Sequence, residues 1–182
     1  VNRYKNSSAV KYWQVENEPY LAFFSSTACG PRDEQLLERE IALVRALDPT
    51  RKIIITDSGE FGTWLSAYKH GDIFGSSMYL YVWWRNRIGP LRYPITPAFF
   101  NIKKNIIALL AGKKDSMVIE LEAEPWLLQP IVNTPLDIQF SRMGIDKFNE
   151  MISFSAKTNF RDVYLWGGEW WYWMKNNNHH PE

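Results

Sequence analysis

The sequence contains a single cysteine, Cys29, so no disulfide bond can form within the chain. It also lacks an excess of charge of either sign, because 21 Lys and Arg stand against 20 Asp and Glu, for a formal net charge of +1. A balance this close to neutrality argues against nucleic acid or an anionic membrane surface as the main partner. No apolar run approaches the roughly 20 residues that a membrane-spanning helix needs. The composition is that of an ordered globular protein.

Motifs for cofactors and metal ions are absent as well. The glycines do not form the spacing of a dinucleotide-binding loop or of a phosphate-binding loop. His179 and His180 have no further histidine or cysteine at a spacing that suits zinc. We therefore expect neither a cofactor nor a metal ion.

Aromatic side chains are what the sequence has in abundance. Nine Trp, nine Tyr and ten Phe make up 15% of the chain. Flat rings stack on the apolar faces of sugars, although they also build ordinary cores. The clusters Trp83-Trp84 and 170–173 are hard to bury completely, which favours a carbohydrate-binding role for some of these rings.

Short apolar runs alternate along the chain with longer segments of helical periodicity. The pattern predicts strands at 12–15, 52–56, 73–79, 117–121 and 163–166, and helices at 31–47, 61–68, 99–110 and 146–157. Such alternation implies an α/β fold with a parallel sheet and right-handed crossovers. A doubly wound sheet fits this pattern too. The polar residues favour a barrel, because they follow the C-terminal ends of strands, where barrel enzymes carry their chemistry.

Glutamates follow two of these predicted strands. The segment WQVENEP (13–19) places Glu18 just before a proline that turns the chain away. In VIELEAEPW (118–126), Glu120, Glu122 and Glu124 recur with period two and face one side of an extended strand. A single glutamate at a strand end is usually solvated or salt-bridged. Two that converge provide what glycoside hydrolysis needs, a proton donor for the leaving oxygen and a nucleophile for the anomeric carbon.

Asn17-Glu18-Pro19, closing a strand that begins Trp13-Gln14-Val15, resembles strand four of the clan A glycoside hydrolases, the cellulase-like, family 5-like barrels. The resemblance implies a partial (β/α)8 TIM barrel that comprises strands four to eight. Residues 1–182 would then be the C-terminal part of a single barrel domain. Strands one to three would lie upstream in the intact protein.

The resemblance also implies roles for the glutamates. Glu18 would be the acid/base, and Asn17 would hold the sugar 2-hydroxyl. The strand that carries the three glutamates becomes strand seven, where this clan places its nucleophile. The apolar run before it favours Glu120, with Glu122 and Glu124 as the alternatives.

Aromatic residues complete the expected site. Tyr79, or else Tyr81, would reach the nucleophile from strand six, Trp166 would form the floor of the sugar subsite, and Trp126 would be a further substrate contact. The resemblance implies a retaining β-glycoside hydrolase that cleaves a β-linked oligo- or polysaccharide by double displacement. The alternatives are a non-catalytic carbohydrate-binding barrel and a truncated, inactive fragment.

Overall fold

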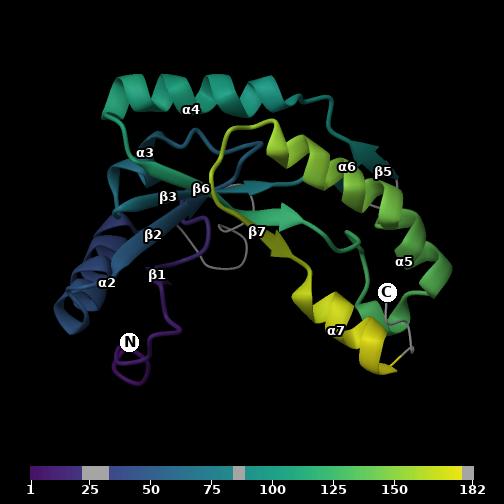
Figure 1. The fold of residues 1–182 in the computed structure, drawn as a ribbon, viewed down its shortest axis with the longest axis horizontal. Helices are drawn as coiled ribbons and strands as arrows, with labels where there is room; N and C mark the ends of the chain where they lie inside the picture. Colours follow the sequence, from purple (N-terminus) through teal and green to yellow (C-terminus); the bar gives the residue numbers. More distant parts are fainter. Residues whose placement is uncertain (22–32, 84–88, 178–182) are drawn as a thin grey trace. The chain divides into compact units, whose positions relative to one another are not determined.

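The computed structural model describes residues 1–21, 33–83 and 89–177, and it has the α/β fold expected from the sequence (Figure 1). Its main sheet has the strand order β1-β2-β3-β6-β7, which is also the order of these strands along the chain. A doubly wound sheet reverses its strand order at a switch point. An order without reversal is instead compatible with consecutive strands of a barrel.

The strand pairs of this sheet whose register is defined are all parallel. β1 (Tyr12–Gln14) pairs with β2 (Lys52–Asp57), and β2 pairs with β3 (Ile73–Met78). β6 (Asp115–Glu122) pairs in parallel with β7 (Val163–Trp166). All five predicted strands are therefore present, and no strand end differs from the expected one by more than two residues.

The chain divides into two compact units, and the boundary falls within β3 and within β6. The first unit comprises residues 1–77 and 102–117, and the second comprises 78–101 and 118–182. Helix α4 (Pro97–Ala111) begins in the second unit and ends in the first.

The first unit is built around β2 and β3, which are almost wholly buried, as strands covered on both faces are. Helix α2 (Glu34–Leu47) precedes β2, and the Asp33 side chain caps it by accepting a hydrogen bond from the Leu36 amide at 2.9 Å. Helix α3 (Leu65–Lys69) is shorter than the predicted 61–68 helix.

The segment between β2 and α3 is a loop because one buried carboxylate organises it. Asp57, which is 1% exposed, accepts hydrogen bonds from the backbone amides of Ser58 and Trp64, each at 2.9 Å. Trp64 has a left-handed backbone with φ 69° and is fully buried. The Trp64 amide, which lies within the predicted 61–68 helix, is thus held by a side chain instead.

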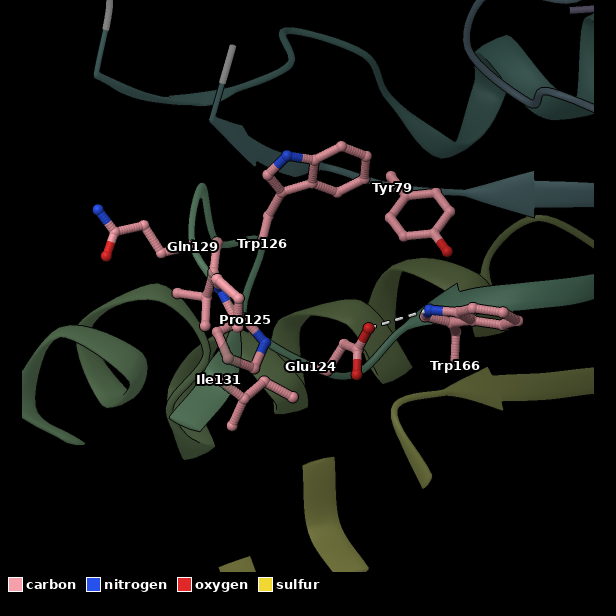
Figure 2. A pocket seen from close by; sticks show the side chains of 9 residues that line it. Tyr79, Glu124, Pro125, Trp126, Gln129, Ile131 and Trp166 are labelled. Carbon is pink, nitrogen blue, oxygen red and sulfur yellow. Dashed lines mark hydrogen bonds between the residues drawn. The ribbon is translucent and has the colours of Figure 1, made fainter. Parts of the chain in front are cut away.

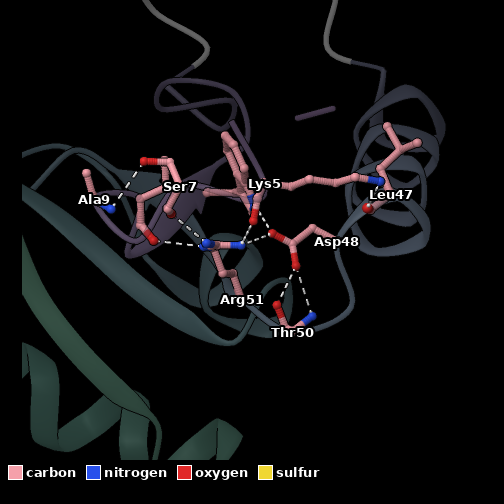
Figure 3. A network of polar contacts seen from close by, with 9 residues as sticks. Lys5, Ser7, Ala9, Leu47, Asp48, Thr50 and Arg51 are labelled. Carbon is pink, nitrogen blue, oxygen red and sulfur yellow. Dashed lines mark hydrogen bonds and ion pairs between the residues drawn. The ribbon is translucent and has the colours of Figure 1, made fainter. Parts of the chain in front are cut away.

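An arginine fastens the N-terminal segment to the turn between α2 and β2 (Figure 3). Arg51 donates hydrogen bonds to the backbone carbonyls of Val10 and Ser7, both at 2.7 Å, and to that of Lys5. It also pairs with the Asp48 carboxylate at 2.6 Å. Hydrogen bonds from Thr50, and then from Trp13 and Arg51, hold the pKa of Asp48 well below its usual range.

The second unit contains elements that the sequence did not reveal. β4 (Tyr81–Trp83) and β5 (Pro90–Arg92) form an antiparallel pair in a segment for which the sequence predicted no strand or helix. A 3₁₀ turn η1 (Ile131–Asn133) and helix α5 (Leu136–Arg142) precede the predicted helix, which is α6 (Ile145–Ala156). Helix α7 (Gly168–Asn177) contains the whole 170–173 aromatic cluster. Among the described residues, none of the helices is long and apolar enough to cross a membrane.

Candidate active site

Glu120 lies near the C-terminal end of β6 and is held by a tyrosine. Glu120 is 7% exposed, and its Oε2 accepts a hydrogen bond from the Tyr79 hydroxyl at 2.9 Å. Tyr79 directly follows β3, so both groups come from the C-terminal ends of strands. The phenol orients the carboxylate and stabilises its negative charge.

Glu122 is more deeply buried, at 1% exposure, and it binds backbone. Its Oε2 accepts hydrogen bonds from the amides of Leu80 at 2.9 Å and Tyr81 at 2.8 Å. These amides lie where the turn after β3 leads into β4, which begins at Tyr81. Glu122 therefore serves as the anchor of that turn.

Glu124 faces a cavity of about 380 Å³, and its carboxylate accepts a hydrogen bond from the Trp166 indole N–H at 3.0 Å (Figure 2). Burial is the main cause that raises the pKa of Glu124. The Trp166 hydrogen bond opposes this rise, while the negative charge of Glu169 adds to it. The cavity is lined by Tyr79, Glu124, Pro125, Trp126, Leu127, Gln129, Pro130, Ile131 and Trp166.

Two tryptophan side chains at this cavity are partly exposed to solvent. Trp126 is 40% exposed and Trp166 is 43% exposed, and Trp126 meets Tyr79 edge to face with 5.5 Å between ring centroids. A volume above 300 Å³ lined by apolar and aromatic side chains with a few polar groups is typical of a small-molecule site. Of the residues that the sequence placed at a sugar site, Tyr79, Glu124, Trp126 and Trp166 line this cavity, whereas Tyr81, Glu120 and Glu122 are not among the lining residues.

A glycine allows Trp166 to lie close to the segment that follows β6. Gly167 has φ 145°, and a Cβ at this position would come within 2.8 Å of the Ala123 carbonyl oxygen and 3.0 Å of the Glu124 side chain. The Ala123 amide donates to the Trp166 carbonyl at 2.9 Å, which aligns the two strand ends. The contact between Glu124 and Trp166 therefore depends on the missing side chain of Gly167.

Tyr81, the second candidate on the segment after β3, is engaged elsewhere. Its hydroxyl makes a short hydrogen bond with Glu150, whose other oxygen accepts from Arg92 Nε at 2.8 Å and Nη2 at 2.6 Å. Of the two tyrosines, Tyr79 is thus the one whose hydroxyl contacts Glu120.

Glu18 belongs to the first unit and follows β1. Its backbone is left-handed, with φ 48°, and its amide donates to the Thr56 hydroxyl at 2.8 Å. Glu16 is left-handed as well, with φ 59°. Residues other than glycine rarely adopt this conformation, and such strained positions cluster at functional sites. Asn17 is exposed and accepts a hydrogen bond from the Gln14 side chain at 3.1 Å.

A half-buried lysine of helix α4 contacts the loop that follows β2, and nothing in the sequence indicates this contact. Lys103 donates to the Gly59 carbonyl at 2.7 Å and lies 4.2 Å from the centre of the Trp64 ring. Burial lowers the pKa of Lys103 to about 8, although the negative charges of Asp57 and Glu60 oppose that shift. These contacts support the 57–64 loop. Only its place in α4, far along the chain, brings the lysine there, so no local signal marks it.

Within the part of the chain that the structure describes, no group of three or more His, Cys, Asp or Glu side chains is placed to hold a metal ion.

No protein-family model matches the chain, and no curated protein matches its sequence. Among solved structures, the chain is similar to a β-D-glucuronidase of Dictyoglomus thermophilum, with 19% identity and a TM-score of 0.49. The match covers 89% of this chain, which spans only 26% of the length of that protein. A likeness this distant does not bear on function.

Proposed function

We propose that the chain is a retaining β-glycoside hydrolase that cleaves a β-linked oligo- or polysaccharide by double displacement. The observation that supports it most is the pairing of Glu120 with the Tyr79 hydroxyl, 2.9 Å apart, where Tyr79 itself lines a cavity with exposed tryptophan rings. A carboxylate held in one orientation by a residue that borders a ring-lined cavity is suited to attack on a bound sugar. In this proposal β1, β2, β3, β6 and β7 correspond to strands four to eight of a (β/α)8 barrel.

The contacts of the three glutamates support Glu120 as the nucleophile. Glu122 is occupied by two backbone amides, and its removal would disturb the turn after β3. Glu124 binds Trp166, and burial raises its pKa, which makes it less available as an anion. Of the three, only Glu120 accepts a hydrogen bond from a tyrosine that borders the cavity. Glu124 suits a hydrogen bond to a sugar hydroxyl instead.

Glu18 is the proposed acid/base. In the first step Glu120 attacks the anomeric carbon, the glycosidic C–O bond breaks, and the leaving oxygen takes the proton of Glu18. In the second step Glu18, now a carboxylate, takes a proton from water, whose oxygen displaces Glu120. Asn17, next to it, would hydrogen-bond the sugar 2-hydroxyl. The left-handed backbone at Glu18 is the structural feature that favours a functional role there.

The cavity would hold the sugar. Trp166 offers a ring fixed by its hydrogen bond to Glu124, and Trp126 offers a second exposed ring. Rings of this kind cover the apolar faces of a sugar, while Glu124 and Gln129 supply polar contacts at the cavity wall.

The test is hydrolysis of aryl β-glycosides by the chain and by three variants, Glu18→Gln, Glu120→Gln and the control Glu38→Gln. Glu38 is an exposed residue of α2. We expect Glu120→Gln to lose turnover on every substrate. Glu18→Gln should keep activity only where the leaving group needs no proton, and azide should rescue it by forming a β-glycosyl azide. Proton NMR should show the β-anomer as the first product.

Three outcomes would contradict the proposal. A first-formed α-anomer would indicate inversion, and full activity of Glu120→Gln would exclude this residue as nucleophile. Binding of oligosaccharides without any turnover of activated aryl glycosides would instead favour the carbohydrate-binding alternative.

A further inference from the structure

The cavity at Trp166 adjoins two others in the same unit. Trp126 borders both the 380 Å³ cavity and a small one that also touches Trp83, Arg142 and Lys147. Trp83 in turn borders a third cavity of about 280 Å³, which shares Leu127 and Gln129 with the first. The proposed sugar site thus continues past Trp126 toward Trp83.

At the far end of this series, Arg142 stacks on Trp83. The guanidinium carbon lies 3.9 Å from the centre of the Trp83 ring, a close cation–π contact. Arg142 Nε and Trp83 Nε1 are both buried, and neither has a hydrogen-bond partner within the described residues. Buried donors are nearly always satisfied in folded proteins, so two neighbouring donors without an acceptor indicate a group that binds there.

The charges around Arg142 make this site cationic. Arg92 is neutralised by its ion pair with Glu150 at 2.6 Å. Lys147 donates to the carbonyl oxygens of Ser141 at 2.7 Å and Arg142 at 3.4 Å. The guanidinium of Arg142 makes no ion pair with any carboxylate in the described part of the chain. An arginine held by a ring and lacking an acidic partner is suited to bind an anion.

We propose that Arg142 and Trp83 form a subsite for an anionic oxygen group on the substrate, so that the enzyme acts on an acidic saccharide. The inference rests on the proposed function, which it deepens by naming the substrate class. Both donor atoms are buried and the cavity beside them holds only about 10 Å³, so the two side chains would shift apart to let two oxygens of one group accept from Arg142 Nε and Trp83 Nε1. A uronic acid carboxylate and a sugar sulfate ester share this chemistry.

The indole N–H of Trp83 reports on the subsite directly. Its signal in a ¹H–¹⁵N correlation spectrum, assigned by its loss in Trp83→Phe, would be followed during titration with methyl β-D-glucuronide, D-glucose 6-sulfate, methyl β-D-glucoside and sodium sulfate. We expect at least one acidic sugar to shift it and the neutral glucoside to leave it unchanged. The acidic sugar that shifts it identifies the source of the anionic group.

Three arginine variants test the role of the guanidinium. Arg142→Gln should weaken binding of the acidic sugar by about tenfold or more, because a charge-assisted contact is lost. Arg142→Lys keeps the positive charge but loses the planar guanidinium, so its affinity for the acidic sugar should lie between those of Arg142→Gln and the original chain. The control Arg161→Gln, whose side chain is 92% exposed, should bind like the original chain. Thermal unfolding confirms that each variant is folded, and the lysine variant carries the test if the glutamine variant is not.

The inference is overturned if the acidic and neutral sugars give the same response, or if Arg142→Gln and Arg142→Lys both bind as well as the control. It is also overturned if sodium sulfate binds as tightly as either acidic sugar, because the site would then hold an adventitious ion only. Failure of the proposed function looks different: Trp83 would respond to an acidic sugar in an Arg142-dependent way while no glycoside is hydrolysed. Hydrolysis without any acidic preference would retain the function and remove the subsite.

Discussion

Replacing Glu122 with glutamine keeps the size and one carbonyl oxygen of the side chain but removes its charge. That oxygen accepts two backbone amides at 2.9 and 2.8 Å. A hydrogen bond to a charged group contributes about 1.5–3 kcal/mol and a neutral one about 0.5–1.5 kcal/mol, so the two bonds together lose about 2–3 kcal/mol. An amide is less costly to bury than a carboxylate, which offsets part of the loss. We expect a net destabilisation of about 1–2 kcal/mol.

For a chain of this length, that loss corresponds to a fall in Tm of about 2–8 °C. The matched change, Glu120→Gln, removes the charge that receives one tyrosine hydroxyl, so the free energy of unfolding should change by less than about 1 kcal/mol. For turnover, we expect Glu120→Gln to be the more damaging of the two changes. Loss of the nucleophile should lower kcat by about 10⁴-fold or more, whereas Glu122→Gln should keep measurable activity.

The assay combines thermal unfolding, followed by circular dichroism, with initial rates on an aryl β-glycoside for both variants. Each variant serves as the control for the other, because the two residues lie two positions apart on the same strand. The reasoning is refuted if Glu122→Gln abolishes turnover at an unchanged Tm while Glu120→Gln stays active. The backbone-bound carboxylate would then be the nucleophile.

Three further outcomes are expected. Tyr79→Phe removes the hydroxyl 2.9 Å from Glu120, and kcat on an aryl glycoside should fall by about 10- to 100-fold while KM changes little. Gly167→Ala places a Cβ 2.8 Å from the Ala123 carbonyl at φ 145°, so urea unfolding should show a loss of about 1–3 kcal/mol. The pKa of Asp48 is lowered on folding, so the stability it contributes is complete above pH about 4 and is lost as the pH falls further; Asp48→Asn should flatten the difference in urea midpoint between pH 5 and pH 2.5.

The strands were predictable because their signal is local. β2 contains the apolar run 53–55 and β3 begins with Ile73 and Phe74, and every residue of the two strands except Lys52 is buried. The strand order, which argues against a doubly wound sheet, needed the structure, since both windings share the same alternation of elements.

Helix α7 was missed although a signal existed. Gly167-Gly168 looks like a turn, and the tryptophans after it were considered as ligands for sugars. Trp170 and Met174 are four residues apart and both are buried, which is helical spacing. Trp170 donates to the Gln139 side chain at 2.7 Å, so this ring belongs to the core.

The choice of Glu120 as nucleophile over Glu122 and Glu124 rests on contacts that the sequence does not show. Period two predicted that Glu120, Glu122 and Glu124 share one face of the strand, but it could not separate their roles. The contacts that separate them come from Tyr79, from the backbone of the following turn and from Trp166, all distant in sequence from β6. The Arg142–Trp83 pair was likewise not predictable, because it joins a helix and a strand that the pattern did not reveal.

The attachment made by Arg51 has a consequence for how freely the N-terminal segment can be altered. The guanidinium contacts main-chain carbonyls at Ser7 and Val10, and every amino acid provides such a carbonyl. Side chains at these two positions can therefore be exchanged, or replaced by a graft of equal length, without loosening the segment. Lys5 is the exception within the segment, because its side chain donates to the Leu47 carbonyl at 3.2 Å and should be retained in such a graft.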